Sequence, residues 1–455
     1  MRIALAGLLV LGLAATAHAN GRDPYTSTIN FRRGNEQDII AGMTFGAVVS
    51  HDGGATWHWF CERAIGYGGL YDPDYVYSAS GAVFATTYDG LKVMRDGCSF
   101  NATPPGMTFV SKVEGSPDGA IYFAAADQND AKIYKSTDDG MTFPPGSAVM
   151  LGTGGEWWSS LAVAPTNAQR IYLTGYRLDG INPKVNLMKT SVNGATSFTD
   201  MSLTGITPLS ANSTIEVIDI SPKIDTTLYI KVSYESDAIT DSIYRSTNAG
   251  ASWTKILSKK SAFPLAFVVR KDGTTCVAGT REMGGLVSTD CSTAATPTWT
   301  PLTNGPHIGC LYRDSADTVW ACTQNYASPP PIEIPSDGYG IMKSTDLTTW
   351  TPVLKFQDIK APVPCAAGTV QQDQCVLPYD GQRSVWCCLI PQLFITSTEI
   401  DCTGPMACFD PPDGAPDTGP AKKDPGCCGA GSGKSSALLS LLVAAVLLVR
   451  RRKPS

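Results

Sequence analysis

The sequence predicts an all-β protein: a seven-bladed β-propeller of four-stranded antiparallel blades, then a small disulfide-rich segment and a C-terminal hydrophobic helix. Two observations predict the ring. A short turn motif occurs seven times, and strand-like runs flank each copy. Successive copies lie 42 to 56 residues apart, the length of a four-stranded propeller blade. We therefore expect the propeller over 20–360 and the cysteine-rich segment over 361–409.

The first 19 residues have the pattern of a secretory signal peptide. Arg2 precedes an apolar run over 3–13, and small residues end at Ala17-His18-Ala19. We expect cleavage after Ala19 and export of the rest of the chain. A buried N-terminal helix is the less favoured alternative.

The strands of each blade are visible around its turn motif. In the fifth unit, IEVIDISP (215–222), TLYIKVSY (227–234) and SIYRS (242–246) precede the motif. Alternating β-branched and aromatic residues between turn residues are typical of strands and hairpins. The motif is therefore the turn between the third and fourth strands. We expect any ligand at the opposite face, where the second-to-third-strand loops and the inter-blade loops meet.

The motif itself is typified by SHDGGATW at 50–57. Aspartate or asparagine accepts hydrogen bonds from nearby backbone N–H groups, glycine supplies positive φ, and the final aromatic residue re-enters the blade. Asparagine occupies two of the seven positions and cannot act as a general acid or nucleophile. We therefore interpret the whole set as structural: Asp52, Asp96, Asp138, Asn193, Asn248, Asp290 and Asp346.

The pattern S-x-D-x-G-x-T-W resembles the Asp-box (BNR) repeat of sialidases, sortilin-type receptor ectodomains, xyloglucan-cleaving glycosidases and the photosystem II assembly factor propeller. The resemblance covers Thr26 to about Lys355 and implies the sialidase-like propeller fold, but little about function. Sialidases carry an arginine in a Phe/Tyr-Arg-Ile-Pro motif at the start of the first strand. Here FRRG at 31–34 keeps only the first two letters, at the end of that strand, which argues against sialidase activity.

Aromatic and basic residues gather in the loops of the expected ligand face. Aromatic rings suit sugar rings or peptide side chains, although the tryptophan pair could equally pack between blades and the arginines could pair locally. The candidate ligand-binding residues are Trp157, Trp158, Arg63, Arg177, Arg281, Tyr176 and Tyr326.

A glycoside hydrolase would need two carboxylates across the central pore. Glu156, paired with Asp127 or Glu282, is the nearest candidate for such a catalytic pair. Neither a G-x-S-x-G elbow nor an oriented Cys–His pair is present, so the sequence gives no support to serine or cysteine hydrolysis.

The sequence suggests no metal, cofactor or nucleic-acid partner. His51, His58 and His307 do not form a ligand-spaced cluster, and GSGKSS at 431–436 lacks the first glycine of a phosphate loop. The net charge is −6 and basic runs are confined to the C-terminal tail, so no nucleic-acid footprint is expected.

Fourteen cysteines in an exported chain indicate disulfides. Two pairs flank hairpin turns symmetrically, and a third pair remains in the propeller: Cys276–Cys291, Cys310–Cys322 and Cys61–Cys98. The others are expected to form a separate cluster: Cys365, Cys375, Cys387, Cys388, Cys402 and Cys408.

The C-terminus has three parts: a Pro/Gly-rich linker over 410–426, then a cysteine pair, then an apolar run ending in basic residues. The tail over 427–455 resembles the myxobacterial C-terminal sorting signal (MYXO-CTERM), which implies processing by a sorting protease near Cys427 and Cys428 and display at the cell surface. The apolar run over 435–449 spans roughly 22 Å, short of a bilayer core, and the following basic cluster keeps the end cytoplasmic. A plain membrane anchor is the alternative.

The sequence thus favours a non-enzymatic, surface-displayed propeller that binds a glycan or protein ligand at the cell envelope. A glycoside hydrolase acting on extracellular polysaccharide is the alternative, and a structural stalk without a ligand is a third interpretation.

Overall fold

The structure is a computed structural model. It describes residues 23–403 except 70, 105–108, 126–130, 145–148, 151–154, 179–183, 207–208, 236–238, 329–330 and 379–383. The expected signal peptide, linker and sorting tail, with Cys427 and Cys428, lie outside the described residues, as do Asp127 and Cys408.

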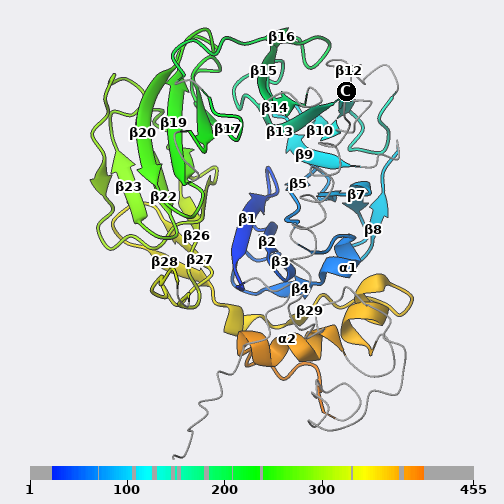
Figure 1. Cartoon of the computed structure of the whole chain (residues 1–455). Helices are drawn as coiled ribbons and strands as arrows, with labels where there is room; N and C mark the ends of the chain where they lie inside the picture. Colours follow the sequence, from blue (N-terminus) through cyan, green and yellow to red (C-terminus); the bar gives the residue numbers. More distant parts are fainter. Residues whose placement is uncertain are drawn as a thin grey trace, which may run out of the picture.

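Seven four-stranded antiparallel units follow one another along the chain and form a ring (Figure 1). This confirms the seven-bladed propeller. The blades comprise, in order, β1 (Thr26–Phe31), β2 (Ile39–Met43), β3 (Gly46–Ser50) and β4 (His58–Phe60); β5 (Tyr75–Tyr77), β6 (Val83–Thr87), β7 (Gly90–Met94) and β8 (Phe100–Ala102); β9 (Val110–Gly115), β10 (Ile121–Ala125), β11 (Lys132–Ser136) and β12 (Val149–Met150); β13 (Glu156–Val163), β14 (Ile171–Arg177), β15 (Val185–Ser191) and β16 (Thr199–Asp200); β17 (Thr214–Ile220), β18 (Leu228–Ser233), β19 (Thr240–Ser246) and β20 (Thr254–Lys260); β21 (Ala266–Val269), β22 (Cys276–Thr280), β23 (Gly284–Ser288) and β24 (Thr300–Pro301); and β25 (Cys310–Arg313), β26 (Val319–Cys322), β27 (Ile341–Ser344) and β28 (Thr351–Leu354).

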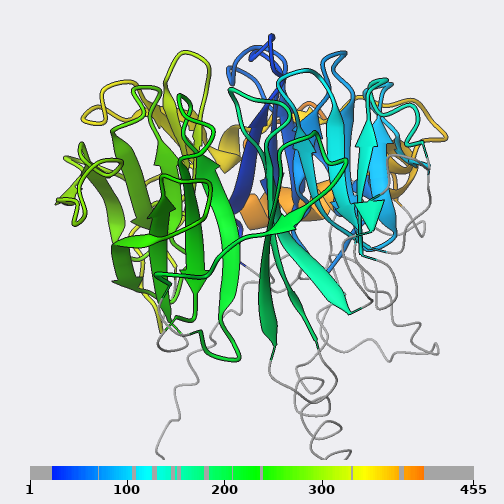
Figure 2. The same ribbon diagram turned by 90° about the horizontal axis from the view of Figure 1, so that it is seen from above.

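The first strand of each blade lies on the inside of the ring, as the labels β1, β5, β9, β13 and β17 show (Figure 1). Figure 2, turned by 90°, shows the strands running through the thickness of the ring. The second strands β2, β6, β10 and β22 are buried along their whole length, because both faces of each sheet pack against a neighbouring blade.

Innermost strands of neighbouring blades are joined by a recurring strut, in which a side chain on one blade accepts a hydrogen bond from a backbone N–H of the next. Asp219 is one example: its Oδ2 accepts from the N–H of Val269 at 2.7 Å, and burial raises its pKa to about 6. The others are Asp74 to Val113 and Ser160 to Val217.

The remaining elements are a short helix after the first blade and the C-terminal segment. They are α1 (Glu62–Ile65), η3 (Phe356–Asp358), β29 (Ala361–Pro362), η4 (Gln371–Val376) and α2 (Val385–Leu393). β29 adds a parallel fifth strand outside β4, so that α2 lies along the outer edge of the first blade (Figure 1). Within the described residues, no helix is long and apolar enough to cross a membrane.

Both hairpin pairs expected from the spacing, Cys276–Cys291 and Cys310–Cys322, are disulfide-bonded. The expected Cys61–Cys98 bridge is wrong, and so is the separate six-cysteine cluster. Cys61 bonds Cys375 and Cys98 bonds Cys365, so the C-terminal segment is tied covalently to the first two blades; Cys387 bonds Cys402 within the segment. Symmetry about a turn identifies only local partners, and these two bridges join elements 314 and 267 residues apart.

Candidate functional site

The repeated turns are held by one hydrogen-bond pattern. In the first turn, Asp52 Oδ1 accepts from Ser50 Oγ at 2.8 Å and from the N–H of Thr56 at 2.8 Å. Where Asn193 takes this position, its Oδ1 accepts from the N–H of Ser197 at 3.0 Å, the same bond made with an amide oxygen. The role of these turns is therefore structural, because a carboxylate oxygen and an amide oxygen accept the same backbone hydrogen bond.

The same bonds lower the pKa values of the turn carboxyls. Hydrogen bonds from Ser136 and Thr142 lower the pKa of Asp138 to about 2, from 3.8. At Asp52, burial acts in the opposite direction, but hydrogen bonds from Thr56 and Ser50 outweigh it and lower the pKa to about 2. Both side chains are anionic acceptors at neutral pH.

We expect Asp138→Asn to unfold near the wild-type temperature at neutral pH, since Asn193 and Asn248 hold equivalent turns. Asp138→Ala should unfold measurably lower. Because the folded-state pKa lies below the ordinary 3.8, the carboxylate stabilises the fold above about pH 4 and this contribution is lost as the pH falls towards about 2. Between neutral pH and about pH 2, the melting temperature of Asp138→Asn should therefore fall by less than that of the wild type. Equal melting temperatures for Asn and Ala at neutral pH would contradict the structural role.

The opposite face carries a chain of contacting aromatic rings, which we call the aromatic ridge. Neighbouring ring centroids lie 4.6 to 6.4 Å apart. Tyr88, on the β6–β7 turn, is 55% exposed, while the ring of Trp157 on β13 is half-buried against Phe109. The ridge crosses the first four blades and comprises Tyr67, Tyr71, Tyr88, Phe109 and Trp157.

Hydrogen bonds fix the inner rings of the ridge. The Tyr67 hydroxyl donates to the Gly46 carbonyl at 3.0 Å, which ties it to the β2–β3 turn. The Tyr71 hydroxyl lies 2.7 Å from Thr86 Oγ1 and 3.1 Å from the Val110 carbonyl, so it bridges the second and third blades. The ridge is thus preorganised, with Tyr88 as its most exposed ring.

The two tryptophans at the start of β13 take different environments. Trp157 contacts the ridge, whereas Trp158 is 2% exposed and packs between the third and fourth blades with Tyr122 and Leu173. Trp158 therefore belongs to the core and is not placed to contact a ligand.

Glu156 and Arg177 face each other across β13 and β14, 4.0 Å apart. Glu156 is 3% exposed, and burial raises its pKa despite the nearby charges of Lys189 and Arg177. Its Oε2 has no hydrogen-bond partner among the described residues. Arg177 and the expected catalytic carboxylate are thus joined in one local pair.

The other sequence candidates are engaged in the fold. Arg281 donates through Nε and Nη2 to Gln324 Oε1 at 3.0 and 2.8 Å, and its guanidinium lies over the rings of Tyr25 and Phe263. Glu282 Oε2 accepts from the N–H of Ala262 at 3.1 Å.

Tyr326 donates its hydroxyl to the Leu393 carbonyl and so anchors α2. Arg63 lies on α1, which contacts η4. Tyr176 sits beneath the ammonium of Lys184, 5.0 Å from its ring centroid. The structure therefore joins Glu156 with Arg177, and Trp157 with the ridge, but does not bring the three arginines into one cluster.

A polar group on the last two blades was not expected from the sequence. His307 Nδ1 lies 2.9 Å from Asp337 Oδ1, and Asp337 Oδ2 accepts from the N–H of Gln324 at 2.8 Å. Since Gln324 also accepts from Arg281, the side chains of His307 and Arg281 are held through shared partners. Asp337 occurs in a loop without a motif, so no sequence signal identified it.

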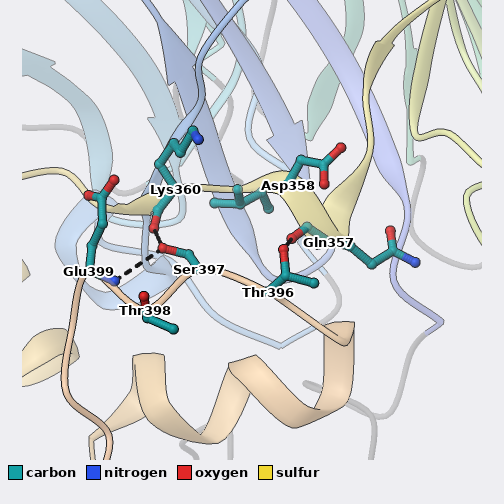
Figure 3. Close-up of a pocket in the computed structure, with 8 residues that line it drawn as sticks. Gln357, Asp358, Lys360, Thr396, Ser397, Thr398 and Glu399 are labelled. Carbon is teal, nitrogen blue, oxygen red and sulfur yellow. Dashed lines mark hydrogen bonds between the residues drawn. The ribbon is translucent and has the colours of Figure 1, made fainter.

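A polar pocket lies at the C-terminal segment (Figure 3). Its walls are 357–360 and 396–399, joined by bonds such as that from the Thr396 N–H to the Gln357 carbonyl at 3.0 Å. Lining groups such as Ser397, which donates to the Lys360 carbonyl, are already hydrogen-bonded within the chain. Within the described residues, no three His, Cys, Asp or Glu side chains are grouped to hold a metal ion.

The ring of seven sheets and the repeated turn in each sheet define the chain as a seven-bladed β-propeller. Solved structures with a similar chain path include the GH74 xyloglucanase from Xanthomonas campestris, at 14% identity over 71% of this chain and 70% of that chain, with a TM-score of 0.35. They also include the Dos1 propeller, at 11% identity over 74% and 84% of the two chains, with a TM-score of 0.44.

A third is a protein of unknown function from Dyadobacter fermentans, at 13% identity over 65% and 89%, with a TM-score of 0.36. At this identity the likeness concerns the fold alone. No protein-family model and no curated protein matches the chain.

Proposed function

We propose that this propeller is a non-enzymatic binding module, and that its ligand lies across the aromatic ridge. The observation that carries the proposal is the continuous chain of five contacting rings on the face opposite the repeated turns. A single exposed aromatic residue is ordinary on a protein surface. Here Tyr88 is 55% exposed and contacts the partly exposed rings of Tyr71 and Phe109, so the outer part of the ridge offers neighbouring aromatic surfaces.

A glycan fits this surface better than a compact apolar ligand. Tyrosine and tryptophan present ring faces together with polar groups, which suits the alternating apolar and hydroxyl faces of sugar rings. Arg177 and the Asp337-anchored His307 add donors and acceptors elsewhere on the same face. A protein ligand is the alternative.

Hydrolysis is the less supported alternative. Glu156 is buried beside Arg177, and the exposed carboxylate of Glu282 accepts hydrogen bonds from the loop at 261–262. Asp127 lies outside the described residues. A hydrolase would place two carboxylates about 5–9 Å apart.

We propose that the module acts at the outer cell envelope after export, which the resemblance of the tail to a sorting signal supports. The disulfides support export, since such bonds persist in oxidising compartments.

The test is a glycan array probed with the exported chain and with Trp157→Ala and Tyr88→Ala. Both variants should lose about two- to tenfold in affinity for any glycan that the wild type binds, because each removes one stacking surface worth roughly 0.5–1.5 kcal/mol. Tyr234→Ala is the matched control: Tyr234 is 45% exposed on a blade outside the ridge, and its loss should leave binding unchanged. Equal binding by wild type and Trp157→Ala, or release of sugar from the bound glycan, would overturn the proposal.

A further inference from the structure

The ring has a seam where the last blade meets the first. Each of these blades is built from its own consecutive strands, β1 to β4 and β25 to β28. Direct contacts across the seam include the edge-to-face pair of Phe31 and Trp320, 5.0 Å apart, and hydrogen bonds from Ser315 to the Glu36 carboxylate at 2.7 and 2.8 Å. The Glu36 contacts are exposed, so water competes with them.

The C-terminal segment crosses this seam. We define it as 356–378 and 384–403. It leaves β28 of the last blade, and the N–H of Phe356 donates to Asn325 Oδ1 at 3.0 Å. It then runs beside β4 of the first blade, where the N–H of Val363 donates to the Trp59 carbonyl at 2.9 Å.

Beyond β29 the segment is bonded covalently to two blades. Cys365 bonds Cys98, in the repeated turn of the second blade, and Cys375 bonds Cys61, at the end of the first blade. The buried side chain of Gln371, at the start of η4, joins the segment to the end of β4: it donates to the Trp59 carbonyl at 2.8 Å and accepts from the N–H of Cys61 at 3.1 Å.

The segment finally returns to the last blade. α2 packs its Trp386 against Trp59, 5.5 Å between ring centroids, and ends where Leu393 accepts from Tyr326. Its path therefore runs from the last blade to the first and second blades and back again.

We propose that this segment is a clasp that closes the ring, and that the ring opens at its seam when the clasp disulfides are reduced by a dithiol. Each disulfide takes two electrons and two protons from the dithiol and becomes two thiols, while the dithiol becomes a cyclic disulfide. In this proposal the clasp adds a covalent connection between the ring ends to the noncovalent contacts across the seam, which include the apolar cluster that Ile29 of the first blade shares with Trp320 of the last. The blades themselves keep their own hydrogen-bonded sheets when it is cut.

The two clasp bridges differ in access. Cys98 and Cys365 are both partly exposed, whereas Cys61 is 2% exposed and Cys375 is fully buried. Thiol–disulfide exchange requires that the attacking thiolate reach a sulfur atom. Mild dithiothreitol should therefore reduce Cys98–Cys365 first, which alkylation and mass spectrometry of the full chain would show.

Hydrogen exchange of the full chain tests the clasp. In the variant that lacks both clasp bridges, Cys61→Ser/Cys98→Ser/Cys365→Ser/Cys375→Ser, amides of β1, β25 and β26 should exchange at least about tenfold faster than in wild type, while β14 and β18 keep their rates. The matched control is Cys276→Ser/Cys291→Ser, which removes a fully buried bridge within one hairpin and should change exchange only around β22 and β23.

Hydrogen exchange of wild-type protein, reduced with dithiothreitol and then reoxidised, is a second test that needs no mutation. The exchange rates of the seam amides in β1, β25 and β26 should rise on reduction and fall again on reoxidation. Wild-type exchange rates at the seam in the reduced protein or in the variant without both clasp bridges would overturn the proposal, as would an equal rise at the seam in the control.

Discussion

Replacing Trp59 with alanine should cost about 3–5 kcal/mol of unfolding free energy, among the largest losses of any single substitution in the chain. Trp59 lies on β4, the outer strand of the first blade, yet it is only 1% exposed because α2 and η4 cover it. Its Nε1 donates to the Phe45 carbonyl at 2.8 Å, and its ring contacts Trp386. The substitution removes a large core side chain and the partner of α2 together.

Trp59→Phe separates these effects. It keeps most of the ring volume but leaves the Phe45 carbonyl without its donor, so it should cost roughly 1–3 kcal/mol. Denaturant unfolding of the three proteins measures both losses. If Trp59→Ala unfolded at the wild-type midpoint, the C-terminal segment would not be packed on the first blade as described.

The fold was predictable because its signal is repeated. Each turn motif specifies its own hydrogen bonds through residues that are near in sequence, such as Ser50, Asp52 and Thr56. Local information of this kind survives in one sequence without any knowledge of the tertiary structure. The two hairpin disulfides were predictable for the same reason.

The clasp and the ridge were harder to predict because their partners are distant in sequence. Cys61 and Cys375 are 314 residues apart, and no spacing rule connects them. Tyr71 and Phe109 lie in loops between blades, and the packing of consecutive blades brings Phe109 into contact with both Tyr71 and Trp157. Trp157 and Trp158 are adjacent in sequence, but they alternate on β13, so one faces the ridge and the other the core.

Gly175→Ala should damage both stability and ligand binding, because this glycine sits directly beneath the ridge. Gly175 on β14 pairs with Trp158, where β13 carries a bulge. A Cβ at this position would lie 2.0 Å from the Trp157 carbonyl oxygen and 2.9 Å from the Trp158 Cα. These are backbone atoms, so rotating a side chain cannot relieve the overlap and β13 must move.

We expect a loss of about 1–3 kcal/mol in unfolding free energy, the usual cost of forcing extra volume into a packed site. The displaced strand carries Trp157 with it, so any glycan that binds the ridge should bind Gly175→Ala more weakly even below the unfolding temperature. Gly68→Ala is the matched control, since a Cβ there meets nothing within 4 Å on the same face beside Tyr67. If Gly175→Ala kept wild-type stability and binding, β13 would not approach β14 closely at the bulge. The position described for Trp157 would then also be wrong.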